Sequence, residues 1–548
     1  MKCQSKPKRV GTLVRHMKGR KIDIGFFAKS EDGSLLILSL MLFLLMAMMG
    51  GLAVDLMRFE QRRTDMQQTL DRSVLAAASI SQELDPEDVV NDYFAKAGLS
   101  DNLDWVNVSS GLNFRAVTAA ASSTLSPFFM NMIGIDDIEV GTGSGAEQRI
   151  TNVEVSMVLD ISGSMQNTPS RIINLKAAAK EFVDTVLSSD EEDRISISLV
   201  PYNGQVNLGP NLFSKYTQSY THNFPNSYCM DLPTSTFNTE SVPRNSARPQ
   251  AGFFDSYSSA STSSSYQSPQ SPYYVSPNYV NVWCQPNLNN IVRPLQNNIG
   301  LLQGYIEGLS AVGATSIDLG MKWGLNLLSP DTASVVSGLV SDGIVPSQFN
   351  GRPFDYTRPD SMKVIVLMTD GEHFAAEELN DAYRTGNSPI YRSKGDGRVS
   401  IYHNRSGTNY DYYRPDNNSW NLAPYSNTSA GYERLTWPDV WASYRMKWVA
   451  WQLYARPLGS SQYNTMMNAF RSQTPTNEMD NRLQDVCNLA KNKGVIVYGI
   501  AFEAPYDGQT QIRNCATSTS HYFDVSGVDI STAFRSIANN ISQLKLTQ

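Results

Sequence analysis

An acidic and hydroxyl-rich segment directly follows an apolar run in the first third of the chain. The run, residues 153–159, has the length and composition of a buried β-strand, and Asp160, Ser162 and Ser164 come at its carboxyl end. Oxygen ligands of this kind suit a hard divalent cation such as Mg²⁺, which prefers octahedral geometry and keeps some of its water. In an open α/β sheet, ligands bind at the carboxyl ends of the strands. The segment is therefore a candidate metal site.

Two later segments add ligands of the same type. The apolar run 362–368 indicates a second buried parallel strand, and it is followed by Asp370. Between the two strands, Thr315 directly precedes a helix predicted over residues 316–328, so its hydroxyl would lie near a helix N-terminus. The alternative is that all these residues only cap a helix and form turns.

This set, Asp-x-Ser-x-Ser followed by Thr and then Asp, resembles the metal-ion-dependent adhesion site of von Willebrand factor A (vWA) domains. The resemblance implies that Ser162, Ser164 and Thr315 contact Mg²⁺ or Mn²⁺, while Asp160 and Asp370 act directly or through water. It also implies that the open coordination position takes a carboxylate from a partner protein. The metal would then act as a bridge between proteins.

Composition and motifs exclude several other functions. The net charge of −7 gives no overall attraction to nucleic acid, and the sequence has no phosphate-binding loop, zinc-ligand spacing or nucleophile elbow. Near the metal motif, only Glu372 and His373 are candidates for a general base, and we interpret them as a loop residue and a solvated loop histidine. We therefore expect a protein that is no enzyme and has neither a nucleic-acid partner nor a small-molecule substrate.

Residues 33–54 carry no charge and have the length of a membrane-spanning helix. Residues 1–32 form a predominantly basic tail, so the positive-inside rule predicts a cytoplasmic N-terminus and a single pass through the membrane, with the rest of the chain outside. A cleaved signal peptide is the alternative, although its apolar core would be shorter and no clear cleavage site follows. We favour an uncleaved anchor.

The helix is predicted to continue beyond the membrane as an amphipathic segment until Asp85-Pro86. Its sequence resembles the N-terminal segment of TadE/G-like pilus-assembly proteins, and residues 112–150 resemble the strand-rich bridge of TadG-like proteins. The residues that carry the first resemblance are Gly50-Gly51-Leu52-Ala53-Val54-Asp55, Arg62-Arg63, Gln67, Leu70-Asp71 and Leu75-Ala76-Ala77-Ala78. Residues 55–150 are thus expected to form a pilin-like helix and this bridge. Leu38 stands where prepilins carry a glutamate, so we do not predict prepilin cleavage.

Residues 151–548 are expected to form an α/β domain of the vWA, Rossmann-like type with a mostly parallel sheet. Helices are predicted over 170–188, 478–493 and the C-terminal segment, strands over 195–200 and 495–502, and a short antiparallel strand near 205–208. Two large insertions interrupt this pattern, at about 210–295 and 374–470. In the second, five aromatic side chains recur on one face of a predicted helix (Trp437, Trp441, Tyr444, Trp448 and Trp451). Such a stripe usually packs on its own domain, and the alternative is a partner- or glycan-binding surface.

Four of the five cysteines follow the predicted membrane span, an even number that suits disulfides in an oxidising compartment. We favour the pairs Cys229–Cys284 and Cys487–Cys515, although four cysteines allow three pairings and the sequence does not choose among them.

Together these features predict an accessory protein of a Flp/Tad pilus, anchored in a bacterial inner membrane and facing the periplasm, that binds pilus or secretion-complex components through the metal site. A surface adhesin with the same metal site is the alternative. A membrane vWA protein that serves a chaperone complex is a third class.

Overall fold

The computed structural model describes residues 32–79, 82, 84–111, 114–149, 152–188, 190, 193–256, 279–358 and 361–544. The predicted basic tail, up to residue 31, and the centre of the first insertion, residues 257–278, lie outside the described residues. The chain divides into two compact units. One comprises Met1–Ser109 and Ala116–Glu147, and the other comprises Ser110–Arg115 and Gln148–Gln548.

The first unit is built on the long helix α2 (Asp32–Ala77). Its first half is apolar and exposed, and among the described residues α2 is the one helix long and apolar enough to cross a membrane. Its second half buries Met66, Leu70 and Val74 against the helix α3 (Pro86–Lys96) and a three-stranded sheet. Asp85 caps α3 by accepting a hydrogen bond from the Glu87 amide, which explains why the chain turns at Asp85-Pro86.

The sheet of the first unit has the order β1-β2-β3, with β1 (Leu103–Gly111), β2 (Phe114–Leu125) and β3 (Ile138–Arg149). The strand-rich segment therefore begins at Leu103, earlier than the predicted residue 112. It shares a core with α2 and α3 because Val117, Ala119, Ala121 and Val140 face those helices. A short 3-10 helix, η1 (Ser100–Asn102), precedes β1, and another, η2 (Met130–Ile133), lies in the loop between β2 and β3.

The second unit contains a six-stranded sheet of order β18-β17-β9-β4-β5-β8. When the six strands are numbered 1 to 6 along the chain and the sheet is read from β8 to β18, the order is 3-2-1-4-5-6. This is the order of doubly wound α/β folds. All pairs are parallel except β5 with β8. The predicted vWA-type α/β fold is confirmed. The strands are β4 (Asn152–Asp160), β5 (Ile195–Tyr202), β8 (Arg293–Gln296), β9 (Ser361–Thr369), β17 (Ile496–Phe502) and β18 (Tyr522–Val525).

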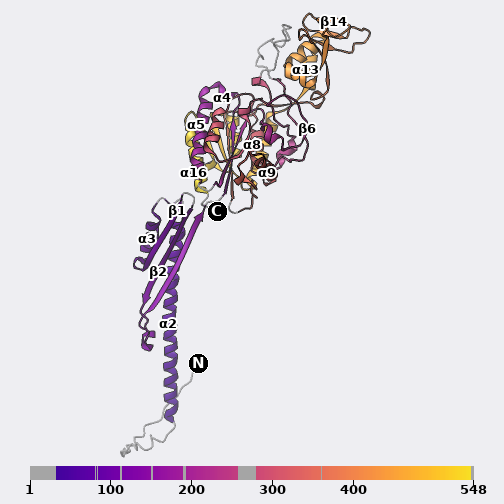
Figure 1. Ribbon diagram of the computed structural model, residues 1–548. Helices are drawn as coiled ribbons and strands as arrows, with labels where there is room; N and C mark the ends of the chain where they lie inside the picture. Colours follow the sequence, from indigo (N-terminus) through magenta and orange to yellow (C-terminus); the bar gives the residue numbers. More distant parts are fainter. Residues whose placement is uncertain are drawn as a thin grey trace, which may run out of the picture. The chain divides into compact units, whose positions relative to one another are not determined.

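Helices cover both faces of this sheet (Figure 1). The helices α5 (Pro169–Leu187), α7 (Ile299–Gly308) and α16 (Asp529–Leu544) share one apolar core with the sheet, and α8 (Ile317–Asn326), α9 (Ala333–Ser341), α14 (Thr476–Asn492) and α15 (Tyr506–Cys515) share the other. The strands are apolar on both faces because each face is covered, and β4 is buried from Val153 to Asp160. Shorter helices lie in the connections: α4 (Ser164–Asn167), α6 (Gly209–Phe213), η3 (Thr234–Asn238), η5 (Tyr279–Asn281), η6 (Leu288–Asn290), η7 (Pro330–Thr332), η8 (Ser347–Phe349), η9 (Asp381–Tyr383) and η11 (Thr519–His521).

The antiparallel edge strand is not where the sequence predicted it. The strand that pairs with β5 is β8, which follows the first insertion, whereas residues 205–208 make only an isolated bridge between Asn207 and Ile291. The segment after β5 instead supports a neighbouring loop, since Asn203 accepts a hydrogen bond from the Ser316 amide and donates one to the Val312 carbonyl. Apolar residues alternate with polar ones over 205–208 because Val206 and Leu208 are buried in the core, and the segment does not belong to the sheet.

The second insertion forms a body of its own within the second unit. The two-stranded pair β10 (Ala376–Leu379) and β16 (Arg471–Thr474) closes its base. Above this base lies an antiparallel sheet of order β14-β13-β12-β11-β15, with β11 (Asn387–Ser393), β12 (Val399–Tyr402), β13 (Tyr412–Arg414), β14 (Ser419–Asn421) and β15 (Tyr432–Thr436). Its helices are α10 (Trp437–Ser443), α11 (Met446–Trp448), the π-helix η10 (Val449–Ala455), α12 (Arg456–Leu458) and α13 (Gln462–Phe470).

The aromatic stripe of the second insertion packs inside this body. The predicted single helix is broken at Tyr444, which has extended backbone and ends α10. Trp437, Trp441, Tyr444 and Trp448 are nevertheless buried in one core with Phe470. The interpretation that the stripe packs on its own domain is therefore confirmed for these four side chains.

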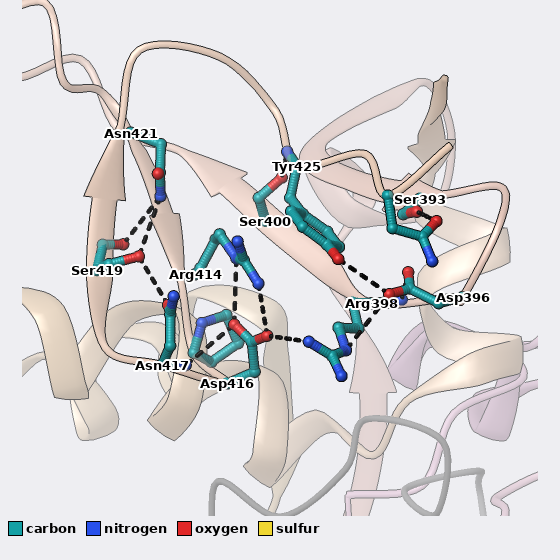
Figure 2. Close-up of polar contacts among 12 residues, drawn as sticks. Ser393, Asp396, Arg398, Ser400, Arg414, Asp416, Asn417, Ser419, Asn421 and Tyr425 are labelled. Carbon is teal, nitrogen blue, oxygen red and sulfur yellow. Dashed lines mark hydrogen bonds and ion pairs between the residues drawn. The ribbon is translucent and has the colours of Figure 1, made fainter. Parts of the chain in front are cut away.

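Polar side chains hold the outer strands of the second insertion together (Figure 2). Asp416 accepts hydrogen bonds from Arg414 at 2.7 Å and from Arg398 at 3.2 Å, and the Tyr425 hydroxyl donates to Asp396 at 3.1 Å. The Arg414 guanidinium also lies 3.6 Å from the centroid of the Tyr425 ring. These groups are partly exposed, so each ion pair contributes at most about 1 kcal/mol.

Two disulfides fasten the second unit, and they are the pairs that we favoured. Cys229–Cys284 closes the first insertion, and Cys487–Cys515 joins the helices α14 and α15. A buried ion pair between Arg384 and Asp231, 2.7 Å long, connects the second insertion to the first, where the short strands β6 (Gln218–Tyr220) and β7 (Arg248–Pro249) also lie.

Candidate metal centre

The sheet brings the two predicted carboxylates to one edge. The strands β4 and β9 are parallel neighbours, and Leu159 is opposite Met368, so Asp160 and Asp370 both follow at the carboxyl ends. The order of the sheet reverses between these two strands. This switch point is where ligands bind in doubly wound folds, because the connections leave it on opposite faces and open a crevice.

Asp160 is fully buried and held by short hydrogen bonds. Its Oδ1 accepts from the Ser162 amide at 2.8 Å, and its Oδ2 accepts from the Thr369 hydroxyl at 2.7 Å. Burial and the neighbouring Asp370 carboxylate raise the pKa of Asp160 to about 7. Burial also raises the pKa of Asp370, although its hydrogen bonds with Ser164 and Arg171 oppose this. A cation bound beside these two carboxylates would favour their charged forms.

The two serine hydroxyls and Asp370 form a continuous chain of oxygen atoms. Ser162 Oγ lies 2.8 Å from Ser164 Oγ, and Ser164 Oγ donates to Asp370 Oδ1 at 2.6 Å. An octahedral Mg²⁺ with ligands at 2.0–2.1 Å places adjacent ligand atoms roughly 3 Å apart. The spacing of the hydroxyls therefore fits two neighbouring positions on such an ion.

The structure also brings Thr315 to this group. The Gly163 amide donates to the Gly313 carbonyl at 2.9 Å, which fastens the loop before α8 to the loop after β4. Gly313 has a positive φ of 87°, a conformation that favours glycine in this turn. A Cβ atom placed on Gly371 would lie 3.6 Å from Thr315 Oγ1 and 3.7 Å from Ser164 Oγ, so both hydroxyls face the same point. All five predicted ligands thus lie together.

Two charged residues that the sequence did not indicate border the site. Arg171, on α5, bonds to Asp370 Oδ2 at 2.9 Å and to Glu503 at 2.7 Å. Both Asp370 oxygens are thereby occupied, one by Arg171 and one by Ser164. This arrangement suits an Asp370 that reaches a metal through water. No spacing in the sequence indicates the contact between Arg171 and Asp370, because the two residues are 199 positions apart and only the fold brings them together.

His373 is buried, so the interpretation as a solvated loop histidine is wrong. Its Nδ1 lies 2.7 Å from an Asp480 oxygen on α14, and its Nε2 accepts from the Asp318 amide in the first turn of α8. The side chain therefore joins the loop after β9 to two helices. It fixes the position of Asp370 relative to Thr315 without belonging to the ligand set. Glu372, in contrast, is exposed in the loop, as expected.

A cleft of about 550 Å³ opens on the site. Ser164, Thr315 and Asp370 lie on its polar side, and the other wall carries Trp283 and Phe374, whose ring centroids are 6.3 Å apart. Trp283 comes from the first insertion and Phe374 from the start of the second. The insertions therefore provide an aromatic wall beside the oxygen ligands.

The oxygen donors fit Mg²⁺ or Mn²⁺ better than softer ions, since the group contains hydroxyls and carboxylates and no sulfur or imidazole ligand. Asp160, Ser162, Ser164, Thr315 and Asp370 are the residues that can hold such an ion, directly or through water. The strand order defines a doubly wound α/β protein, the fold class predicted for the vWA domain.

The N-terminal segment matches a known family model. Residues 33–79 match the model of the family described as "Putative Flp pilus-assembly TadE/G-like". The predicted resemblance of this segment to TadE/G-like proteins is thereby confirmed. No curated protein matches the chain.

Several solved structures are similar to this chain. One is the vWF domain of the type V pili tip protein Mfa5 from Porphyromonas gingivalis, with 14% identity and a TM-score of 0.31 over 73% of this chain and 97% of that chain. Another is the adhesive tip pilin GBS104 from Group B Streptococcus agalactiae, with 12% identity and a TM-score of 0.28 over 71% and 100%. The pilus adhesin SpaC from Lactobacillus rhamnosus GG has 11% identity and a TM-score of 0.29 over 80% and 34%. The fold assignment rests on the strand order and not on these likenesses.

Proposed function

We propose that this protein is an accessory component of a Flp/Tad pilus that binds a partner protein through a divalent metal ion. The observation that carries the proposal is the meeting of Asp160, Ser162, Ser164, Thr315 and Asp370 at the switch point of the sheet. The match of residues 33–79 to a pilus-assembly family supports the biological setting.

In this proposal the metal supplies an open coordination position for a carboxylate of the partner. The chain's own residues hold the ion, exclude bulk water and orient the incoming group. Thr369 and the Ser162 amide keep Asp160 in place, and His373 keeps the Asp370 loop against α8. These residues form a binding site without a positioned general base, so we propose no enzymatic reaction.

The cleft also indicates the kind of segment that the partner presents. A volume of about 550 Å³ exceeds what a carboxylate group fills, and the wall formed by Trp283 and Phe374 is aromatic. We expect an acidic side chain next to a large apolar one, because the first would reach the metal while the second packs on the wall. The membrane anchor over 33–54, with the second unit in the periplasm, would place this cleft where pilus or secretion components assemble.

The metal assignment is tested by thermal unfolding of the full-length protein in detergent, followed by tryptophan fluorescence. All tryptophans except Trp105 lie in the second unit, so the signal reports mainly on the vWA domain. At about 100 times its Kd, Mg²⁺ should add about 2.7 kcal/mol of stability. This corresponds to a rise in Tm of about 3 °C for a unit of roughly 400 residues.

Two variants serve in this test. Asp160→Ala removes a central carboxylate, and Thr315→Val removes only a hydroxyl at nearly constant volume, so the second variant should fold even where the first does not. Both should lose the Mg²⁺-induced rise in Tm. An equal rise in folded Thr315→Val and wild type would show that Thr315 is no ligand, and an equal rise in Asp160→Ala would overturn the metal site.

A further inference from the structure

The loop between β2 and β3 exposes an unusual number of apolar side chains. Residues 126–135 carry no charge and are followed by Asp136 and Asp137. The exposed fractions are 68% for Phe128, 41% for Phe129, 78% for Met132, 51% for Ile133 and 42% for Ile135. Large apolar side chains gathered in this way mark a surface that another phase or molecule covers. We call residues 126–135 the apolar loop.

The apolar loop is fastened to the helix α2 by a buried carboxylate. Asp55 accepts hydrogen bonds from three successive amides of the loop, those of Phe128, Phe129 and Met130, at 2.9, 2.7 and 2.9 Å. Asp55 is only 1% exposed, and Arg58 lies 3.9 Å from it. Because three amides and a guanidinium surround one carboxylate, the loop has a defined position along α2.

A close contact between Gly51 and Phe129 fixes where the apolar loop lies along α2. A Cβ atom on Gly51 would lie 2.4 Å from the Phe129 ring, so only a glycine lets this ring rest on the helix. Gly51 belongs to the apolar stretch predicted to span the membrane, residues 33–54. It lies three residues before the end of that stretch, about 4.5 Å along the helix axis. Phe129 therefore lies level with the outer end of the predicted span.

We infer that the apolar loop inserts into the outer interface of the lipid bilayer beside the α2 span. This inference rests on the membrane anchor of the proposed function and adds a second contact with the same membrane. Amphipathic segments lie in the interface with their apolar side chains at the boundary of the acyl chains. Exposed apolar side chains of α2 continue past Gly51 to Val54, Leu56 and Met57, so the apolar loop rests on a part of the helix that is itself exposed and apolar.

The charges around the loop fit this position. Arg58 lies on the water side of the span, and its guanidinium is 4.0 Å from the centroid of the Phe128 ring. Arginine and aromatic side chains are typical of the level of the lipid headgroups. Asp136 and Asp137 follow the loop where the chain returns to water as β3. The loop would thus fix the tilt and depth of α2, and with them the height at which the first unit stands on the membrane.

The inference is tested with a fluorescent reporter in the full-length protein reconstituted in phosphatidylethanolamine–phosphatidylglycerol vesicles. In a Cys3→Ser background, the environment-sensitive dye NBD is attached to Met132→Cys in the apolar loop. Two matched positions serve as controls: Leu40→Cys within the span and Ser109→Cys near the far end of β1. Emission is recorded with and without lipids that carry a quencher at the headgroup or along the acyl chain.

We expect the label at Met132 to emit at shorter wavelength than the label at Ser109, and to be quenched by lipid quenchers at headgroup level. A Met132 label that resembles the Ser109 label, while the Leu40 label is quenched, would overturn the inference and leave the anchor intact. Absence of quenching at Leu40 would overturn the anchor itself. Shielding of Met132 from water without any lipid quenching would overturn the inference and assign the apolar loop to a contact with a second copy of this chain.

Discussion

At the residue scale, the balance of charge around Asp370 decides how strongly the site attracts a cation. Two buried carboxylates face each other there, and Arg171 supplies one positive charge at 2.9 Å from Asp370 Oδ2. The same guanidinium repels a divalent ion placed between the carboxylates. Arg171 therefore stabilises the site when no metal is bound and weakens its attraction for a metal.

Substitution of Arg171 should therefore have opposite effects on stability and on metal binding. Arg171→Gln should lower the Tm in the presence of a chelator, because Asp370 loses its partner, and should lower the Kd for Mg²⁺, because one nearby positive charge is removed. Isothermal titration with Mg²⁺ and thermal unfolding with EDTA measure the two effects. Arg535→Gln is the control. It removes an exposed ion pair between Arg535 on α16 and Glu181 on α5, the helix that also carries Arg171. Weaker Mg²⁺ binding in Arg171→Gln than in Arg535→Gln would contradict the argument.

The grouping of the five candidate ligands was predictable from the sequence, whereas their neighbours were not. Asp160, Ser162 and Ser164 are close in the chain, and Thr315 and Asp370 follow recognisable elements, so pattern and order sufficed. Arg171 meets Asp370, and Glu503 meets Arg171, only because α5 and the end of β17 lie beside this site in the fold. His373 was misplaced for the same reason, since its burial depends on α14, which lies more than 100 residues later.

At the scale of elements, the site depends on how three segments are held relative to one another. The loop after β9 carries Asp370, the loop before α8 carries Thr315, and α14 supports both. His373 connects all three through Asp480 on α14 and the amide of Asp318 on α8. Outer groups of this kind keep metal ligands in place, and their loss typically lowers metal affinity by about 10- to 100-fold.

His373→Ala should therefore raise the Kd for Mg²⁺ by about tenfold although His373 is not a ligand. His521→Ala, which removes the histidine just before β18, should leave the Kd unchanged. Mg²⁺ titration of both variants, with circular dichroism to verify folding, checks this expectation. A folded His373→Ala protein with the wild-type Kd would show that the three segments hold their positions without this side chain.

Elements with a strong local pattern were predicted correctly, and those whose partners are distant were not. The strands at 153–159, 195–200, 362–368 and 495–502 are mostly apolar runs, which mark strands covered on both faces. The edge strand β8 has four residues and lies about 90 residues after β5, so no local pattern connects the two. The aromatic stripe has helical spacing, but Tyr444 breaks the helix because its ring stacks on Trp448 in the insertion's own core.

At the scale of the whole molecule, the two units carry different parts of the proposed function. The first unit contains the apolar loop and the helix that matches the TadE/G-like family model, and the second contains the candidate metal site with its aromatic cleft. A chain of this kind can keep a binding site at a bilayer while pilus components pass or assemble. Anchoring and binding are then separable, and a substitution at the metal site should leave membrane insertion intact.

We therefore predict the outcome of electron microscopy on four strains: wild type, a deletion, and Asp160→Ala and Thr315→Val at the native locus. The deletion and both variants should lack pili, while immunoblots of membrane fractions show the variants at wild-type abundance. The physical reason is that assembly needs the partner's carboxylate at the metal, and each variant removes a group of that site without touching the anchor. Normal pili with impaired attachment of the variant cells would instead identify an adhesin that uses the same site. Normal pili and normal attachment in cells with folded Asp160→Ala would show that neither pilus assembly nor attachment needs the metal site.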